Sequence, residues 1–276
     1  MASTLEKRIE DIEEEMMGLG NRIEEDLFDI IKTLISSSDS DDAVPKAVQS
    51  IRNLYHDKLL MQDEDGIGEK LREIPDHNFA FFHNTLVDYT LDLAEVIPFA
   101  DERHDRLVGV VKGLKATAIP AGEFDPSNPQ LGWNDDGLEE KAAETWRTFF
   151  PDRDATKEQE DRLSTGINRH AYLAKVIGAG LLDAHASEAV RNIREGLFPD
   201  ADLQTHTLDA RKARELIAAL YVLHAGDRIK ELGLADADKV AAWSSKLAEI
   251  GAAGDSSVWW HLSTYAQKAK AKLAEL

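Results

Sequence analysis

The sequence predicts an all-α protein, a single irregular helical domain of about ten helices with one long loop near the middle. Apolar residues recur at helical spacing through most of the 276 residues, and Ala, Leu, Glu, Lys and Arg are abundant while β-branched runs are scarce. No repeat of fixed period is present, which argues against a solenoid of stacked units. The chain is long enough to bury a sizeable core. We therefore expect one helical domain over residues 1–276.

The first helical stretch is expected from Thr4 to about Ser36. Gly18 and Gly20 predict a break within it, because glycine is unfavourable inside a helix. Apolar residues at helical spacing form one stripe along this stretch: Leu5, Ile9, Ile12, Met16, Ile23, Leu27 and Ile31.

Three further helices are expected before the middle of the chain. Residues 43–62 follow Asp42, a suitable N-cap, and carry Pro45 in the first turn, where a missing N–H costs nothing. Pro75 begins the most apolar helix, which Pro98 ends. A third helix is expected over residues 102–114.

Residues 115–133 form the long loop, which holds three of the chain's eight prolines. A loop of this length in a compact protein is usually functional or divides two parts of the chain. Helices resume after it, at about residues 136–150, 157–182, 187–198, 208–225, 236–250 and 257–276. Their connections are short, which is typical of antiparallel neighbours.

Composition excludes several classes of function. With 52 acidic residues against 32 Lys and Arg, the net charge of -20 repels phosphate backbones and anionic lipid, so we expect neither nucleic acid nor membrane as a partner. The absence of cysteine excludes thiolate metal sites and a cysteine nucleophile. It also fits a reducing compartment, and no apolar run reaches the roughly 20 residues of a membrane span. We expect a cytoplasmic protein.

Carboxylates are the candidate metal ligands. Asn84, Asp88 and Asp92 form a stripe at i, i+4 and i+8, and Asp101 and Asp105 flank a helix start. Mg²⁺ prefers such oxygens, and an aspartate cluster in an all-helical chain resembles class I terpene cyclases, in which it would hold Mg²⁺ against a diphosphate. A solvated stripe and acids at a helix N-terminus explain the same residues without metal, and this interpretation is favoured. No cofactor is expected, and Mg²⁺ belongs to the cyclase alternative.

Aromatic and histidine side chains are the candidates for lining a pocket. His170 shares an apolar helix face with Leu163 and Ile167, so a core histidine is favoured over a catalytic base. Trp133 stands out because it lies in the long loop, where binding residues concentrate. The pocket candidates are Trp133, Phe124, His170, Tyr172, Tyr221 and Trp243.

Four segments together carry a resemblance to a known family: residues 105–108, 168–175, 218–226 and, more weakly, 239–246. In these segments the chain resembles an all-helical family of filamentous fungi that is catalogued only as a domain of unknown function. The resemblance implies an all-helical cytoplasmic fold, a fungal source and no catalytic residues. Some members look as if they accompany specialised metabolism, which favours a small-molecule role. The chain departs from the family pattern at Tyr221, Val240 and Ala242, where bulkier aromatic residues are typical.

Three hypotheses of function follow. The first is binding of a small apolar molecule, with a cyclase or isomerase of specialised metabolism as its catalytic form, since such chemistry needs a shaped apolar pocket more than a triad. The second is a non-catalytic protein-interaction module that uses the stripe of Leu5, Ile9, Ile12 and Met16, and this stripe could also join two copies in a homo-oligomer. The third is the Mg²⁺-dependent cyclase. The sequence leaves the substrate, the reaction type and whether the protein is an enzyme open.

Overall fold

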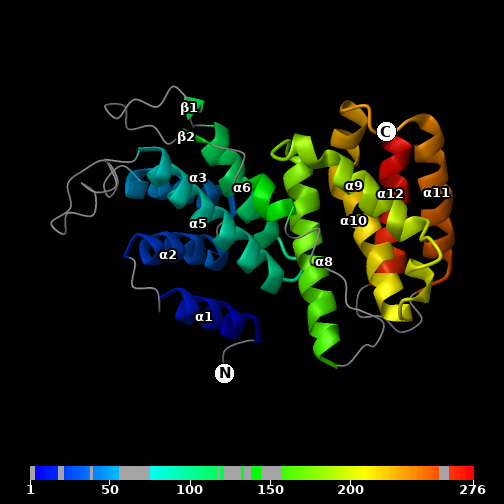
Figure 1. Ribbon diagram of the computed structural model, residues 1–276, viewed down its shortest axis with the longest axis horizontal. Coiled ribbons are helices and arrows are strands. Elements are labelled where there is room, and N and C mark those ends of the chain that lie inside the picture. Colours follow the sequence, from blue (N-terminus) through cyan, green and yellow to red (C-terminus); the bar gives the residue numbers. More distant parts are fainter. Residues whose placement is uncertain are drawn as a thin grey trace. The chain divides into compact units, whose positions relative to one another are not determined.

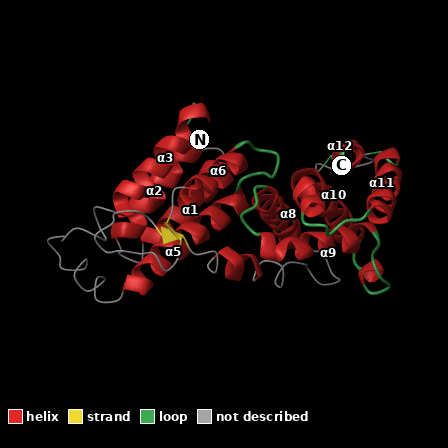
Figure 2. Cartoon of the chain, turned by 90° about the horizontal axis from the view of Figure 1, so that it is seen from above, coloured by secondary structure: helices red, strands yellow, loops and turns green. Residues whose placement is uncertain are grey.

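The computed structural model describes residues 4–17, 22–37, 40–55, 75–116, 119–120, 132–133, 138–143, 157–254 and 261–276. Helices make up nearly all of these residues (Figure 1, Figure 2), so the predicted all-α class is confirmed. The chain divides into two compact units, Met1–Lys141 and Ala142–Leu276, which are described separately. The single domain over residues 1–276 stays a prediction.

The first unit contains α1 Thr4–Met17, α2 Arg22–Ser36, α3 Ser40–Tyr55, α5 Pro75–Val96 and α6 Arg103–Ala116, and its residues 138–141 are also helical. The end of α1 and the start of α2 lie on either side of the predicted break. Helix α3 begins three residues before the predicted start, so Asp42 lies in its first turn and is not the N-cap. Residues 56–62 of the predicted helix lie outside the described residues.

The core of the first unit is formed where α2 packs against α3, α5 and α6, while α1 packs on α2 and α5. The rings of Phe28 and Tyr89, both buried, meet edge to face at 5.5 Å between centroids. Helix α6 approaches α3 closely because Gly113 has no side chain, and a Cβ there would lie 2.7 Å from Val48 Cγ2.

The structure differs in two places from the long loop predicted over residues 115–133. Helix α6 extends to Ala116, and the two-residue strands β1 (Ile119–Pro120) and β2 (Gly132–Trp133) pair in parallel. In this pairing Ile119 lies opposite Gly132. Strands of two residues are too short to produce an alternating pattern that sequence could reveal. The rest of the loop, including Phe124, lies outside the described residues.

The second unit is built around α10. Its elements are α8 Lys157–Gly178, η2 Asp183–His185, α9 Ala186–Leu197, η3 Leu203–Thr205, α10 Leu208–Glu231, α11 Ala237–Ala252 and α12 Leu262–Glu275. Helix α10 packs against α8, α9 and α12, and α11 packs against α12 (Figure 1). Consecutive residues of α10 from Leu216 to Val222 are buried, as expected for a helix that is covered on several sides.

Glycines end two helices of this unit at residues that differ from the prediction. Helix α8 ends at Gly178, before Gly180 adopts a left-handed φ of 73°. Helix α10 continues past residue 225 to Glu231, and Gly233 follows with a φ of 70°. There the Leu234 N–H donates to the Ile229 carbonyl at 3.0 Å, a glycine-dependent C-terminal cap. Helix α12 begins at Leu262, later than predicted, and residues 255–260 lie outside the described residues.

Candidate functional site

The predicted pocket residues His170, Tyr172, Tyr221 and Trp243 all lie in the packed core of the second unit. Two of them are brought together: His170 Nδ1 lies 3.0 Å from the Tyr221 hydroxyl oxygen, and the two rings meet edge to face. The pair joins α8 to α10. For Trp133 the structure places the main chain in β2, and its side chain lies outside the described part, as does Phe124.

Burial sets the chemistry of His170. Desolvation lowers the pKa of its imidazole to about 3, and the positive charges of Arg169, Arg214 and Arg191 act in the same direction. The ring is therefore neutral near pH 7 in the folded protein. A base with so low a pKa is a poor proton acceptor at neutral pH, so the geometry suits a packing role.

The carboxylate stripe of α5 is partly engaged within the first unit. Asp88 Oδ1 accepts from Lys141 Nζ at 3.0 Å, and Asp92 lies one turn further along the helix, half-buried. Across the described ranges, no group of three or more His, Asp or Glu side chains is placed to hold a metal ion.

Asp101 caps the start of α6. Its carboxylate accepts from the Arg103 main-chain N–H at 3.0 Å and from Arg103 Nε at 2.8 Å. These hydrogen bonds and the Arg103 charge lower the pKa of the Asp101 carboxyl. Asp105, two residues into the helix, is exposed. Capping thus accounts for Asp101, one of the proposed metal ligands.

His104 holds the end of α5. Its Nε2 lies 3.1 Å from the Ala94 carbonyl and 3.0 Å from the Ile97 carbonyl, so the proton on Nε2 is shared between two acceptors that the helix leaves open. The ring is fully buried. The sequence does not indicate this contact, because both acceptors are main-chain carbonyls at the end of the preceding helix.

Arg106 holds the end of α2 in the same way. Its guanidinium donates to the Leu34 and Ser37 carbonyls and pairs with the Glu102 carboxylate. Positive charge at a helix C-terminus is favourable. Residues 101–106 therefore join the ends of three helices, which is a structural use of the acidic and basic groups in this segment.

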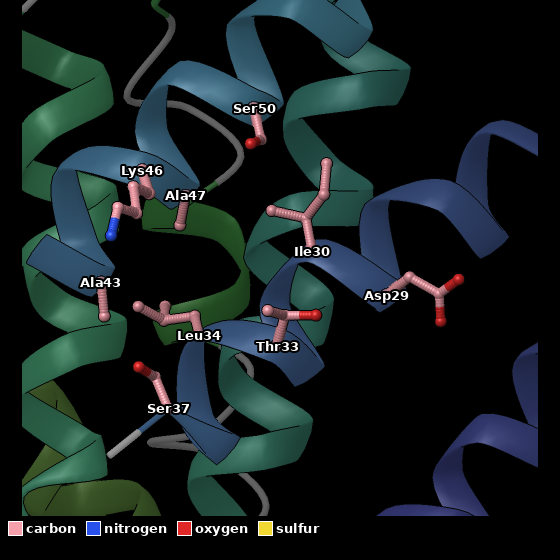
Figure 3. A pocket seen from close by; sticks show the side chains of 9 residues that line it. All are labelled: Asp29, Ile30, Thr33, Leu34, Ser37, Ala43, Lys46, Ala47 and Ser50. Atoms are coloured by element: carbon pink, nitrogen blue, oxygen red, sulfur yellow. The ribbon is translucent and has the colours of Figure 1, made fainter. Parts of the chain in front are cut away.

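The groove between α2 and α3 (Figure 3) is more apolar than the cavities at the start of α6 and between α9 and α10. We call it the α2–α3 groove, with a volume of about 290 Å³. Its lining residues are Asp29, Ile30, Thr33, Leu34, Ser37, Ala43, Lys46, Ala47 and Ser50.

Buried apolar side chains form the floor of the α2–α3 groove. Leu34, Ala43 and Ala47 are 2%, 7% and 5% exposed, and Figure 3 shows Leu34 between the two helices. The polar groups lie at the rim, with the Asp29 carboxylate pointing away. Small residues at i and i+4 of α3, opposite an apolar stripe of α2, were the sequence pattern that could have indicated this groove.

A second cavity, of about 680 Å³, lies at the start of α6. It is polar, and its two arginines, Arg103 and Arg106, are already engaged by carboxylates and carbonyls. The third, of about 150 Å³, lies between α9 and α10. Of the residues predicted for a pocket, the four whose side chains the structure describes, His170, Tyr172, Tyr221 and Trp243, do not line these three cavities.

Comparison with known protein families shows to which family the chain belongs. The family described as "Protein of unknown function (DUF3632)" matches residues 88–267, which is more than half of the chain. The chain belongs to this family. The segments that carried the predicted resemblance all fall inside the matched range, so that prediction is confirmed, while a fungal source stays a prediction. No curated protein and no solved structure matches the chain.

One cavity of this DUF3632 member lies inside the residues that match the family, and another lies outside them. The α9–α10 cavity lies wholly within residues 88–267, whereas the α2–α3 groove precedes them. Among the described helices, none combines the length and apolar character that crossing a membrane requires.

Proposed function

We propose that this protein binds a small apolar molecule in the α2–α3 groove. The observation that carries the proposal is the buried apolar floor of Leu34, Ala43 and Ala47 in a concave site of about 290 Å³. Small-molecule sites are typically apolar hollows from about 300 Å³ upward, with a few polar groups around them. Thr33, Lys46 and Ser50 supply such groups.

The groove supports modest affinity. A ligand that buries about 200 Å² of apolar surface gains about 5 kcal/mol, and the loss of translational and rotational freedom on binding offsets part of this gain. A cyclase or isomerase of specialised metabolism would use the same feature, because its catalysis depends on holding an apolar substrate in one shape. Binding is the part of this proposal that the groove supports directly.

A fluorescent apolar probe tests the proposal. Thr33→Phe places a ring in the groove from an exposed position, so we expect probe affinity to fall at least about fivefold. Gln49→Phe adds the same ring at an exposed position of α3 outside the groove and should leave affinity unchanged. Native mass spectrometry of the protein from its own host then identifies the natural ligand. Equal affinity in both variants would refute the proposed site.

The other two hypotheses have less support. In the stripe of α1 that motivated an interaction module, Ile9 is buried, and α1 contacts α2 and α5. The acids that motivated a Mg²⁺-dependent cyclase include Asp88, paired with Lys141, and Asp101, paired with Arg103. These pairings favour the small-molecule proposal over both.

A further inference from the structure

The negative charge of the chain is concentrated in the first unit. Residues 1–141 contain 32 of the 52 acidic residues and 14 of the 32 Lys and Arg residues, a formal charge of -18. The rest of the chain contains 20 acidic and 18 basic residues and carries the other -2. The α2–α3 groove lies in the first unit, so a ligand reaches it through the field of nearly the whole net charge. This field attracts a cation and repels an anion.

The lysine of the α2–α3 groove is already engaged. Lys46 is the one basic residue among those that line the groove, and its Nζ lies 3.5 Å from Asp42 Oδ2, one turn earlier in α3. The two side chains are 72% and 69% exposed, so this ion pair is weak, but it places a carboxylate beside the lysine. A carboxylate ligand would have to share Lys46 with Asp42, whose own charge repels it.

Asp29 supplies a negative charge at the rim that no cation compensates. In the part of the chain that the structure describes, its carboxylate has no ion-pair partner, and Figure 3 shows it pointing away from the groove. An ammonium group at the rim therefore gains from Asp29 through the field and not through direct contact. Taken together, Asp29, Asp42 and Lys46 carry a formal charge of -1.

The hydroxyl groups of the groove do not select between the two charges. Thr33 and Ser50 line it, and each hydroxyl can accept a hydrogen bond from an ammonium or donate one to a carboxylate. They can hold a polar head group of either sign. The choice between a cationic and an anionic ligand is therefore left to the charged side chains.

Helix dipoles leave this balance unchanged. The groove lies where α2 ends and α3 begins, with Thr33 in the last turn of α2 and Ala43 in the first turn of α3. The partial negative charge at the end of one helix opposes the partial positive charge at the start of the other. The side chains thus determine the preferred charge of the ligand.

We infer that the natural ligand of the α2–α3 groove is an apolar amine, cationic at neutral pH, and not a carboxylic acid. This inference rests on the proposed function, because it names the charge of the molecule bound at the same site. The groove volume of about 290 Å³ corresponds to about ten water molecules, enough for about seven carbons and one ammonium group. Amines and carboxylic acids are both charged at pH 7, so a matched pair of ligands differs in the sign of the charge.

Displacement of an uncharged fluorescent apolar probe by heptylamine, heptanoate and heptan-1-ol tests the inference on the full chain at pH 7. At low ionic strength heptylamine should bind at least about fivefold more tightly than heptanoate, the factor expected for unit charges a few ångströms apart in water. The preference should shrink in 1 M salt, where the Debye length is about 3 Å. Equal affinity of the two charged compounds at low salt would overturn the inference.

The uncharged alcohol separates this failure from failure of the proposed function. If heptan-1-ol displaces the probe and Thr33→Phe weakens it, the groove binds apolar molecules whatever the two charged compounds do. If Thr33→Phe leaves displacement by all three compounds unchanged, the groove is not the site, and both the proposed function and this inference fail.

Variants that remove one charge locate the preference. Asp29→Asn should lower the ratio of amine to carboxylate affinity at least about twofold, and Lys46→Gln should raise it. The matched control, Glu10→Gln, removes a negative charge from an exposed position of α1 outside the groove and should change the ratio less than Asp29→Asn does. Equal changes in these two variants would mean that the amine is attracted to the acidic surface in general, and would overturn the inference.

Discussion

Buried polar side chains in the described chain differ by what they touch. His104 and Arg106 face main-chain carbonyls at helix ends, His170 faces the Tyr221 hydroxyl between two helices, and Arg214 lines the cavity between α9 and α10. The first two satisfy acceptors that helices leave open. His170 and Arg214 are buried away from water, and this burial lowers the pKa of both side chains.

His170 should make the stability of the protein depend on pH. Its pKa is about 3 in the folded state and near 6.5 when unfolded, so the unfolded state binds the proton more readily between these values. Stability from the neutral ring is complete above pH 6.5 and is lost as pH falls toward 3, by about 1.4 kcal/mol per pH unit. Urea unfolding at pH 6 and pH 5 measures the slope. In the His170→Gln variant the slope should be smaller by this amount, and an unchanged slope would contradict the assignment.

His104→Leu should destabilise the first unit. The change keeps a buried side chain of similar size but removes the donor shared by the Ala94 and Ile97 carbonyls, at a cost of about 1–3 kcal/mol for buried acceptors left unpaired. The free energy of unfolding in urea measures it. His104→Gln, which retains an N–H donor, serves as the matched control and should recover part of the loss. If the two variants are equally unstable, packing of the ring and not the hydrogen bonds determines the effect.

Helices of the second unit come close where glycine removes a side chain. A Cβ at Gly178 of α8 would lie 2.0 Å from the His224 carbonyl of α10, so the backbones touch there. At Gly226 of α10, in contrast, a Cβ would meet just Leu276 Cδ1 at 3.3 Å, the end of a flexible side chain. Two helical glycines of similar appearance in sequence therefore have opposite consequences.

Alanine substitution should separate these two glycines. Gly178→Ala forces α8 and α10 apart and should cost about 1–3 kcal/mol, as overpacking of a filled core does. Gly226→Ala should be neutral or stabilising by up to about 1 kcal/mol, because alanine favours the helix and the neighbour can move. Thermal or urea unfolding measures both. Equal effects would mean that the close approach of α8 to α10 does not constrain the fold.

Glycine and proline explain which helix boundaries could be predicted from the sequence. Pro75 begins α5 and Pro98 follows its end, as predicted, while α1 ends at Met17 and α2 begins at Arg22, on either side of the break predicted at Gly18 and Gly20. The helix predicted over residues 208–225 stops before Gly226, yet α10 continues to Glu231, because a glycine tolerated inside a helix looks the same in sequence as one that terminates it. The deciding property is φ, which sequence does not display.

Candidate sites were harder to predict than helices for a related reason. Tyr221 and Trp243 were pocket candidates because aromatic residues line many sites, but both are buried in the packed core of the second unit. The α2–α3 groove instead depends on small side chains of α3 opposite α2, and the α9–α10 cavity is lined by side chains of both helices. Each cavity forms where two helices pack together, so no single residue type in the sequence indicates it.

At the scale of the whole molecule, the question is whether the two units unfold together. Each has its own buried core, with Leu27 and Ile31 among the fully buried residues of the first and Leu220 and Leu247 among those of the second. Separate cores are the usual basis of separate cooperative units, whereas the sequence predicted one domain over residues 1–276.

Hydrogen exchange in a Leu247→Ala variant decides between these possibilities. The substitution empties a fully buried site in α11 and should cost about 2–5 kcal/mol in the second unit. We expect faster exchange of core amides in α10, α11 and α12 and unchanged protection in α2, α3 and α6, because the first unit retains its own core. The matched control, Leu54→Ala in α3, also removes a buried leucine and should reverse the pattern. If either variant speeds exchange equally in both sets of helices, the chain unfolds as the single domain that the sequence predicted, since loss of packing in one unit would then be felt throughout.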